Sequence, residues 1–356
     1  MKRLLVLALL AGAVAACAAI DYNRRYHGGP ATDHFDGAHF FNPAGPIGKG
    51  ALDVIEWRLK GGAAQWPDAV PLEAADHPPE RVNGNALRVT FVGHATVLIQ
   101  TQGLNILTDP HWSERAFMVD WAGPRRVTPP GIAFEDLPPI DLVLVSHNHY
   151  DHMDLATLAR LREAHDPLVV APLGNQQVLL GGDDRMRVHT LDWWGHLAFN
   201  DRVKVHVVPV YHWSRRRLFD RNKALWGGFA IETPGGTLYY GGDTGLWDGK
   251  FFRDARKRFG AFRLAVLPVG AYEPRWFMQD QHVNPAEAVR IHQLLGAPAT
   301  LGVHLRTFQL TDEAIDTPER ELAQALAEHN VAPARFFTLP IGGHWSDGDT
   351  TLGKGP

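Results

Sequence analysis

Residues 146–152 decide the fold, and they read Ser146-His147-Asn148-His149-Tyr150-Asp151-His152. They follow the apolar run 140–145, which has the composition of a buried strand, so the polar segment lies in a loop at the carboxyl end of that strand. Alternate side chains of an extended segment share a face, so His147 and His149 can hold one metal ion. Beyond the bend, Asp151 and His152 can reach a second. The alternatives are a one-zinc site and a solvated loop, although turns favour Gly, Asn and Asp over repeated His.

The composition is that of an ordinary globular protein. The chain has 356 residues, of which 45% are hydrophobic and 21% are charged, and its formal net charge is -4. A chain without a basic field is not expected to bind nucleic acid as its main partner. The arginine cluster 215–217 is most simply a solvated loop, with contact to a phosphate or an anionic lipid surface as the alternative.

The N-terminus has the pattern of a secretory signal. Lys2 and Arg3 precede an apolar stretch over 4–14, which is too short to span a bilayer comfortably. The segment 14–17, Val-Ala-Ala-Cys, resembles the bacterial lipobox, so we expect residues 1–16 to be removed and Cys17 to carry lipid; Cys17 in an ordinary cleaved signal is the alternative. With Ala rather than Asp after the cysteine, the lipobox resemblance implies the periplasmic face of the outer membrane. Cys17 is the only cysteine, which excludes internal disulfides and a thiolate ligand.

Three further regions follow the signal. Residues 17–86 are rich in Gly, Pro, His and aromatic residues without sustained periodicity, which indicates a tether and an extended arm packed on the main domain. We expect Trp57 and Trp66 to anchor the arm, although they could instead line a lipid-facing groove. Residues 87–345 form the main domain, and residues 346–356 are a C-terminal tail.

The main domain alternates short apolar runs with amphipathic segments. A helix is expected over 154–163 with Asp154 as its N-cap, another from the capping box of Asn284 and Glu287, and a third over 317–329. The expected strands lie at 87–92, 96–100, 105–107, 140–145, 203–208, 229–231, 237–240, 264–267 and 300–303. Strands separated by helices favour a layered α/β architecture over an all-β barrel.

Further metal-competent side chains follow the later strands. His212 comes after the strand at 203–208, Asp243 follows the strand at 237–240 in a glycine-rich turn, and His304 ends the strand at 300–303. Each alone has a plain structural explanation, but their recurrence at strand ends indicates a shared site. A carboxylate such as that of Asp243 can bridge two cations. Asp109 is better placed to accept a hydrogen bond from a ligand imidazole and so to fix its tautomer.

In this order, the H-x-H-x-D-H stretch with Asp109, His212, Asp243 and His304 resembles the metallo-β-lactamase superfamily. The resemblance implies a four-layer αβ/βα sandwich with the site at the sheet edges. It also implies two zinc ions, with Asp243 bridging them. One zinc would be held by His147, His149 and His212, and the other by Asp151, His152 and His304.

Within that superfamily the chain is similar to the N-acylphosphatidylethanolamine-hydrolysing phospholipases D. The similarity is carried by the segments 107–110, 137–141, 146–152, 191–194 and, above all, 270–278, Gly-Ala-Tyr-Glu-Pro-Arg-Trp-Phe-Met. One departure is the sequence His304-Leu305-Arg306-Thr307-Phe308, where this family has His-Trp-Gly-Thr-Phe. We expect Arg306 to bring a bulky cation to the substrate side.

The resemblance implies a phosphodiesterase that acts on a phospholipid through a metal-bridging hydroxide. The lipid anchor is expected from the lipobox alone, because the eukaryotic members of this family lack a lipoprotein signal. It assigns catalysis to Asp151 and His282, and substrate contacts to His94, Gln281 and Arg306, while His282 and His94 could instead be structural. The alternatives are a lactone or carboxyl-ester hydrolase with the same dinuclear site, and a non-catalytic envelope lipoprotein with structural zinc. Structural zinc sites usually use Cys, which disfavours the last of these. The sequence does not fix the oligomeric state or the native metal.

Overall fold

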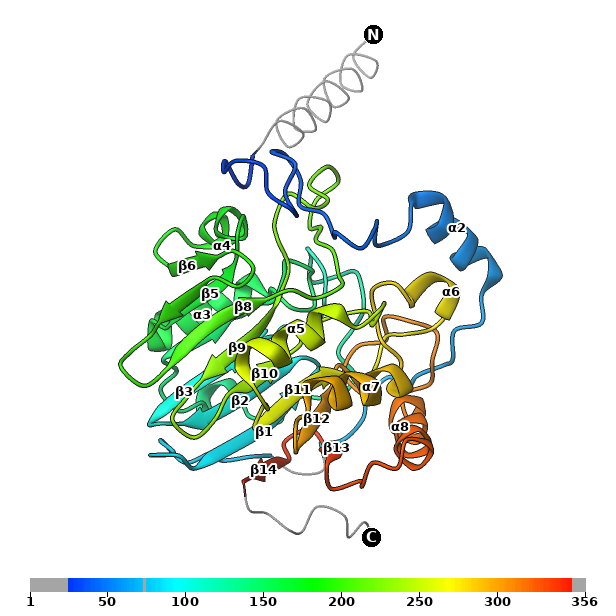
Figure 1. The fold of residues 1–356 in the computed structure, drawn as a ribbon. Coiled ribbons are helices and arrows are strands. Elements are labelled where there is room, and N and C mark those ends of the chain that lie inside the picture. Colours follow the sequence, from blue (N-terminus) through cyan, green and yellow to red (C-terminus); the bar gives the residue numbers. More distant parts are fainter. Residues whose placement is uncertain (1–24, 73–74, 348–356) are drawn as a thin grey trace.

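The computed structural model describes residues 25–72 and 75–347, and the expected signal and lipidation site at Cys17 lie outside them. Two sheets of seven strands pack face to face (Figure 1). The first sheet has the order β14-β1-β2-β3-β4-β5-β6 and contains β1 (Leu87–Gly93), β2 (Thr96–Thr101), β3 (Leu104–Thr108), β4 (Leu142–Leu144), β5 (Leu168–Pro172), β6 (Arg187–Leu191) and β14 (His344–Ser346). The second has the order β13-β12-β11-β10-β9-β8-β7 and contains β7 (His196–Ala198), β8 (Lys204–Val208), β9 (Gly228–Glu232), β10 (Leu238–Tyr240), β11 (Leu264–Pro268), β12 (Thr300–Val303) and β13 (Phe336–Thr338).

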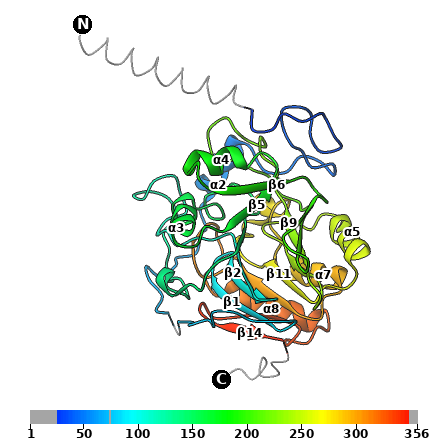
Figure 2. The same cartoon turned by 90° about the vertical axis from the view of Figure 1, so that its left-hand side faces the viewer.

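Helices cover the outer faces of both sheets (Figure 2). The helices are α2 (Ala51–Lys60), α3 (Leu155–His165), α4 (Gln176–Gly182), α5 (Lys250–Phe259), α6 (Arg275–Met278), α7 (Pro285–Leu295) and α8 (Thr317–Glu328), with a 3₁₀ turn at Phe134–Asp136. The expected four-layer αβ/βα sandwich is confirmed. Within residues 25–72 and 75–347, no helix combines the length and the apolar content needed to cross a bilayer.

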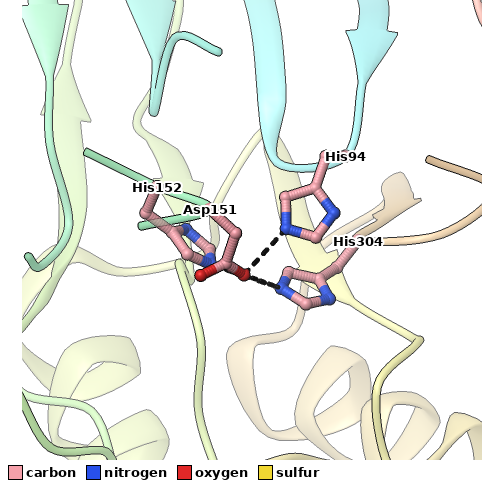
Figure 3. Close-up of side chains that lie close together, drawn as sticks. All are labelled: His94, Asp151, His152 and His304. Atoms are coloured by element: carbon pink, nitrogen blue, oxygen red, sulfur yellow. Dashed lines mark hydrogen bonds and ion pairs between the residues drawn. The ribbon is translucent and has the colours of Figure 1, made fainter. Parts of the chain in front are cut away.

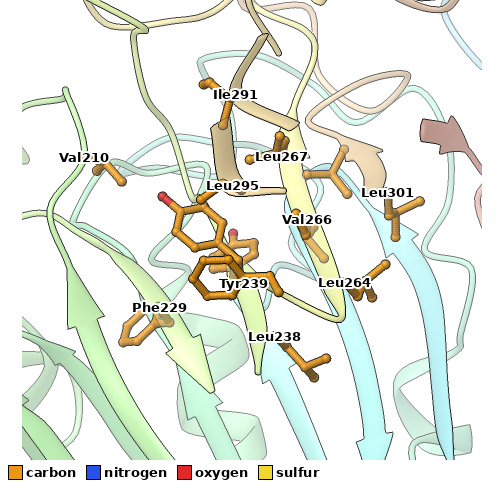
Figure 4. Packing of buried hydrophobic residues seen from close by; sticks show 14 of the residues in the cluster. Val210, Phe229, Leu238, Tyr239, Leu264, Val266, Leu267, Ile291, Leu295 and Leu301 are labelled. Atoms are coloured by element: carbon orange, nitrogen blue, oxygen red, sulfur yellow. The ribbon is translucent and has the colours of Figure 1, made fainter. Parts of the chain in front are cut away.

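The two cores follow from the alternation of side chains along each strand. In β4, Leu142 and Leu144 enter the large cluster between the sheets, whereas Val143 joins the smaller cluster under α3. On the opposite sheet, Ile291 and Leu295 of α7 belong to the large cluster with the residues drawn in Figure 4. Strands buried on both faces read as continuous apolar runs, as the sequence does at 140–145.

Local signals placed the helices that the sequence predicted. The side chain of Asp154 accepts a hydrogen bond from the Ala156 amide, which confirms it as the N-cap of α3. Asn284 and Glu287 form the expected capping box of α7. In the second sheet, β10 to β13 run parallel, as do β3 to β6 in the first. Because the carboxyl ends of parallel strands meet at one edge, the loops after them converge.

The arm differs from the expected extended segment because it contains the helix α2. Its two tryptophans bind the main domain: Trp57 Nε1 donates to Asp312 Oδ2 at 2.9 Å, and Trp66 Nε1 donates to the Glu313 carbonyl at 2.9 Å. At the other end of the chain, Ser346 of β14 pairs with Arg88 of β1, so the expected tail begins inside a strand. Residues 348–356 lie outside the described part.

His34 fastens the start of the arm through both of its ring nitrogens. Nδ1 lies 2.6 Å from Asp33 Oδ1, and Nε2 lies 2.7 Å from Asp192 Oδ1. Burial lowers the pKa of His34, but the hydrogen bonds and charges of Asp192 and Asp33 outweigh burial and raise that pKa above 6.5. Because the pKa of His34 is higher in the folded than in the unfolded chain, protonated His34 stabilises the fold. This stabilisation is fully present below about pH 6.5, the unfolded value, and is lost as the pH rises through the raised folded-state pKa.

We therefore expect His34→Phe to lower the melting temperature below pH 6.5 and to have a progressively smaller effect at higher pH. Thermal unfolding of both proteins across this pH range measures the difference. His189→Phe is the control, because His189 is exposed on β6. A melting-temperature difference that is the same at every pH would contradict a charged His34.

Candidate metal centre

The structure brings together the seven side chains that the sequence singled out, at the ends of strands from both sheets. They lie after β4 (His147, His149, Asp151 and His152), after β8 (His212), after β10 (Asp243) and after β12 (His304). Every one of these side chains belongs to a group whose potential ligand atoms lie within 4.8 Å of one another. The segments are far apart in the sequence, and only the meeting of the two sheets makes them neighbours.

Three neutral imidazoles form the first group. His147 Nε2 lies 2.8 Å from His149 Nδ1, which lies 3.2 Å from His212 Nε2. Burial lowers the pKa of each ring, to about 4 for His149 and about 3 for His212. Neutral imidazoles with convergent lone pairs are the form in which histidine binds a metal ion.

The second group combines imidazoles with a carboxylate (Figure 3). Asp151 Oδ2 lies 3.2 Å from His152 Nε2 and 3.4 Å from His304 Nε2. Burial opposes the charged forms, but Asp243 and Asp151 outweigh it, and they raise the pKa of His304 to about 9 and that of His152 well above its usual value. The buried carboxylates therefore attract positive charge to this point.

Asp243 joins the two groups. Its Oδ2 lies 3.1 Å from His152 Nε2 and 3.8 Å from His212 Nε2, while its Oδ1 lies 3.2 Å from His304 Nε2. Glycine allows this approach: Gly242 has φ +55°, and a Cβ there would meet the Ser146 Cβ at 2.7 Å. The two oxygens of one carboxylate thus face different histidines.

Asp109 supports the site from the end of β3. It accepts hydrogen bonds from the Ser146 amide at 2.7 Å, from His152 Nδ1 at 2.7 Å and from the Tyr240 hydroxyl at 2.5 Å. The bond to Nδ1 leaves Nε2 of His152 pointing at the cluster, which is the role that the sequence assigned to Asp109.

Backbone strain concentrates at the same place. His94, Asp109 and His304 have φ values of 54°, 35° and 67°, in the left-handed region that costs a non-glycine residue about 1–2 kcal/mol. The amide of His304 donates to the His94 carbonyl at 2.7 Å, so two strained turns hold one another.

The donor set fits metal ions. In the first group, three ring nitrogens approach one another, and a hydrogen bond between two of them leaves the third lone pair without a proton. Among the described residues, Asp243 Oδ1, His282 Nδ1 and His304 Nδ1 are buried without a hydrogen-bond partner. Buried polar atoms are normally paired, and a cation would satisfy the convergent lone pairs.

The three predicted substrate-contact residues, His94, Gln281 and Arg306, lie in different surroundings. Gln281 and His282 line a pocket of about 260 Å³ beside His149, Asp151 and Asp243, so their expected roles stay predictions. The prediction for Arg306 is wrong in its direction: its guanidinium pairs with Glu319 and lines a different pocket with Val70 and Thr128, because the backbone turns at φ 56°.

His94 also departs from its expected place. It is 1% exposed and does not line the pocket; instead its Nε2 donates to Asp151 Oδ2 at 3.0 Å, and its ring centroid lies 3.9 Å from that of His304. It therefore belongs to the metal-binding cluster rather than to the substrate wall. The signal available in the sequence was its position directly after a strand, in the Gly-His-Ala-Thr segment 93–96.

We expect His94→Ala to weaken binding at the second group about 10–100-fold while binding at the first group persists, because His94 orients the Asp151 carboxylate. Competition with a chromogenic chelator measures both affinities. His189→Ala removes an exposed histidine and serves as the control. Equal losses at both groups would contradict a local role.

A sandwich of two sheets whose strand ends gather histidines and aspartates in this way defines a metal-dependent hydrolase. The chain belongs to the β-lactamase superfamily, since the model of the β-lactamase superfamily domain matches residues 104–305.

Curated relatives narrow the comparison. The chain is 36% identical over 275 residues to the N-acyl-phosphatidylethanolamine-hydrolyzing phospholipase D 1 of Caenorhabditis elegans, covering 74% of this chain and 77% of that protein. It is 37% identical over 260 residues to the mitochondrial N-acyl-phosphatidylethanolamine-hydrolyzing phospholipase D of Saccharomyces cerevisiae, covering 71% and 54%. The solved isothiocyanate hydrolase from Delia radicum gut bacteria shares the fold, with a TM-score of 0.58, 19% identity and coverage of 72% and 98%.

Proposed function

We propose that this protein is a zinc-dependent phosphodiesterase that cleaves N-acylphosphatidylethanolamine-like phospholipids into phosphatidate and an N-acylethanolamine. The observation that carries the proposal is the composition of one pocket. Its lining combines the metal-competent residues His149, Asp151 and Asp243 with apolar residues, which are Trp57, Ala116, Ala271, Met278 and Leu310. Such a pocket suits a phosphate ester with an apolar chain. The similarity to two phospholipases D supports the same substrate class.

Zinc is the metal that this donor chemistry favours, because imidazole and carboxylate ligands without sulfur are typical of catalytic zinc sites. When bound, two such ions supply an ionised water at neutral pH and neutralise the phosphoryl oxygens. The first group and the second group would each hold one ion. Asp243, which lies near His152 and His304 of the second group and near His212 of the first, would be a ligand to both.

The reaction requires that the water oxygen bonds to phosphorus while the bond from phosphorus to the ethanolamine oxygen breaks. The leaving oxygen takes up the proton that the attacking water gives up. His282 lines the pocket with its Nδ1 3.9 Å from Asp243 Oδ2, and burial, reinforced by His212 and His304, lowers its pKa to about 3. A neutral His282 would donate one N–H to the leaving oxygen as negative charge develops there. Gln281 beside it, with a buried and unpartnered Oε1, would orient the polar headgroup.

The proposed location of the protein depends on residues 1–17, which lie outside the described part of the chain. We propose that Cys17 is lipid-modified after removal of residues 1–16, which would hold the enzyme on the periplasmic face of the outer membrane beside its substrate.

The test is an assay of the purified, zinc-loaded full chain with N-acylphosphatidylethanolamine and, in parallel, with an acyl lactone. Release of phosphatidate and N-acylethanolamine supports the phosphodiesterase. Turnover of the lactone alone would replace it with a carboxyl-ester hydrolase, and failure to turn over either substrate in a chain holding two metal ions would favour a non-catalytic zinc protein.

A further inference from the structure

Large apolar side chains are exposed on three segments of the described chain. They are Leu52, Val54, Ile55 and Leu59 on α2, Phe117, Met118 and Trp121 in the loop after β3, and Leu218 and Phe219 in the loop after β8. Leu59 is 82% exposed, Trp121 78% and Leu218 68%. Outside these segments, the exposed large apolar residues of the described chain are Phe41, Leu180 and Trp247. We call the three segments the apolar rim.

The apolar rim borders the pocket at the metal centre. Trp57 of α2 lines that pocket, as do Ala116, which precedes Phe117, and Trp213 at the start of the third segment. On α2, Leu52, Ile55 and Leu59 recur at helical spacing and point away from the contact that Trp57 makes with the domain. Phe117 and Met118 themselves line a neighbouring pocket with Tyr150 and Arg216. Exposed apolar side chains on segments that also line a pocket mark an interaction surface.

Contacts through Tyr150 link two segments of the apolar rim, the loop after β3 and the loop after β8. The ring of Phe117 lies 5.5 Å from that of Tyr150, and the Tyr150 hydroxyl donates to the Arg216 carbonyl at 2.5 Å. The Arg216 guanidinium in turn donates to the Met153 carbonyl at 2.7 Å, just beyond the metal-binding segment. The loop after β8 is thus fixed to the metal centre.

The third segment of the apolar rim lies in a positively charged loop. Residues 215–221 contain four arginines and one aspartate, a formal +3, in a chain whose net charge is -4. Arg217 is exposed, and the adjacent Leu218 is exposed as well. Cationic and large apolar side chains side by side are typical of surfaces that bind anionic lipid.

The N-terminal end of the described chain lies on the same loop. The Tyr26 hydroxyl donates to Asp220 Oδ2 at 3.0 Å, and the Arg221 guanidinium donates to the carbonyls of Ile47 and Lys49. The blue N-terminal segment and α2 occupy one end of the ribbon in Figure 1. The nine steps from Cys17 to Tyr26 span at most about 30 Å, so a lipid on Cys17 would keep this end near a membrane.

We propose that the apolar rim docks on a phospholipid bilayer containing anionic lipid and turns the mouth of the metal-site pocket toward it. A bilayer fits better than a second copy of the chain, because pairing two identical rims would oppose two arginine-rich loops and close both pockets. This proposal rests on the proposed function in one respect, that the substrate is a membrane lipid. The docking itself requires no turnover.

Tryptophan fluorescence provides the test, because residues 1–24 contain no tryptophan and a membrane-bound N-terminus is therefore silent. The full chain is mixed with phosphatidylcholine vesicles brominated in the acyl chains, with or without a quarter of phosphatidylglycerol. We expect quenching that depends on phosphatidylglycerol and falls at least twofold in Trp121→Phe and in the double variant L59S/L218S. The matched control is Leu180→Ser, an exposed leucine outside the apolar rim.

Hydrolysis and docking fail separately in this design. Asp243→Asn, although inactive, should be quenched like the unaltered chain. If the unaltered, zinc-loaded chain is quenched but does not hydrolyse phospholipid, the proposed function is overturned and the docking is not. Absence of quenching on anionic vesicles, or equal quenching in the rim variants, would overturn the docking. A dimer in solution that L59S/L218S dissociates, without quenching of the unaltered chain, would identify a second copy as the occupant instead.

Discussion

Replacement of Asp243 by Asn is expected to lower turnover by more than about 1,000-fold while the chain still folds, because the change removes a charge that both ligand groups share. Its Oδ2 lies 3.1 Å from His152 of the second group and 3.8 Å from His212 of the first, and its Oδ1 lies 3.2 Å from His304. An amide keeps the shape but presents an NH₂ to one of those imidazoles. We expect the metal content to fall from about two ions per chain to about one or fewer, as measured by elemental analysis beside the hydrolysis rate.

The control for this variant is Asp254→Asn, which makes the same chemical change on the surface of α5, where the carboxylate pairs with Lys250. It should leave both metal content and turnover unchanged. Two bound metal ions and full activity in Asp243→Asn would refute the shared-ligand geometry.

The second large effect is expected for Asp109→Ala, which should cost about 3–5 kcal/mol of folding free energy. Asp109 is fully buried and accepts hydrogen bonds from Ser146, His152 and Tyr240. Alanine leaves these donors buried without an acceptor and frees the His152 ring to rotate. Urea unfolding of the metal-free chain measures the stability loss, and chelator competition should show metal affinity reduced about 10–100-fold.

Asp109→Asn separates charge from shape, because the amide retains one acceptor oxygen, and it should lose less stability than the alanine variant. Asp136→Ala, at a half-exposed carboxylate outside the site, is the surface control. If Asp109→Ala unfolded at the same urea concentration as the unaltered chain, Asp109 would not be the support that its hydrogen bonds indicate.

Much of the site was readable from the sequence because its residues follow strands directly. The three histidines and one aspartate in the stretch 146–152 indicated metal binding, and His212, Asp243 and His304 follow recognisable apolar runs. Capping residues such as Asp154 and Asn284 located helices because their hydrogen bonds are made within three residues. The helices α4, α5 and α6 have no side-chain N-cap, and they were not predicted. The internal strand β5 and the edge strands β6, β7, β13 and β14 were not predicted either.

The sequence did not predict the contacts of residues whose side-chain direction depends on the local backbone conformation. Arg306 follows His304 by two positions, yet a left-handed turn sends it to Glu319 instead of the pocket. The same kind of turn brings His94 into contact with Asp151. Trp57 is a pocket residue only because the arm crosses the domain surface and carries α2 to the site.

The sequence by itself determined the donor chemistry and the strand ends that carry it, since ligand type and hydrophobic alternation are local properties of the chain. Tertiary structure alone decided which donors face one another, that Asp243 stands between two groups, and that the exposed leucines of α2 lie beside the pocket. Those relations join residues as far apart as Trp57 and Asp312, 255 positions along the chain, and only the packing of two sheets and the arm around a common core fixes their distances.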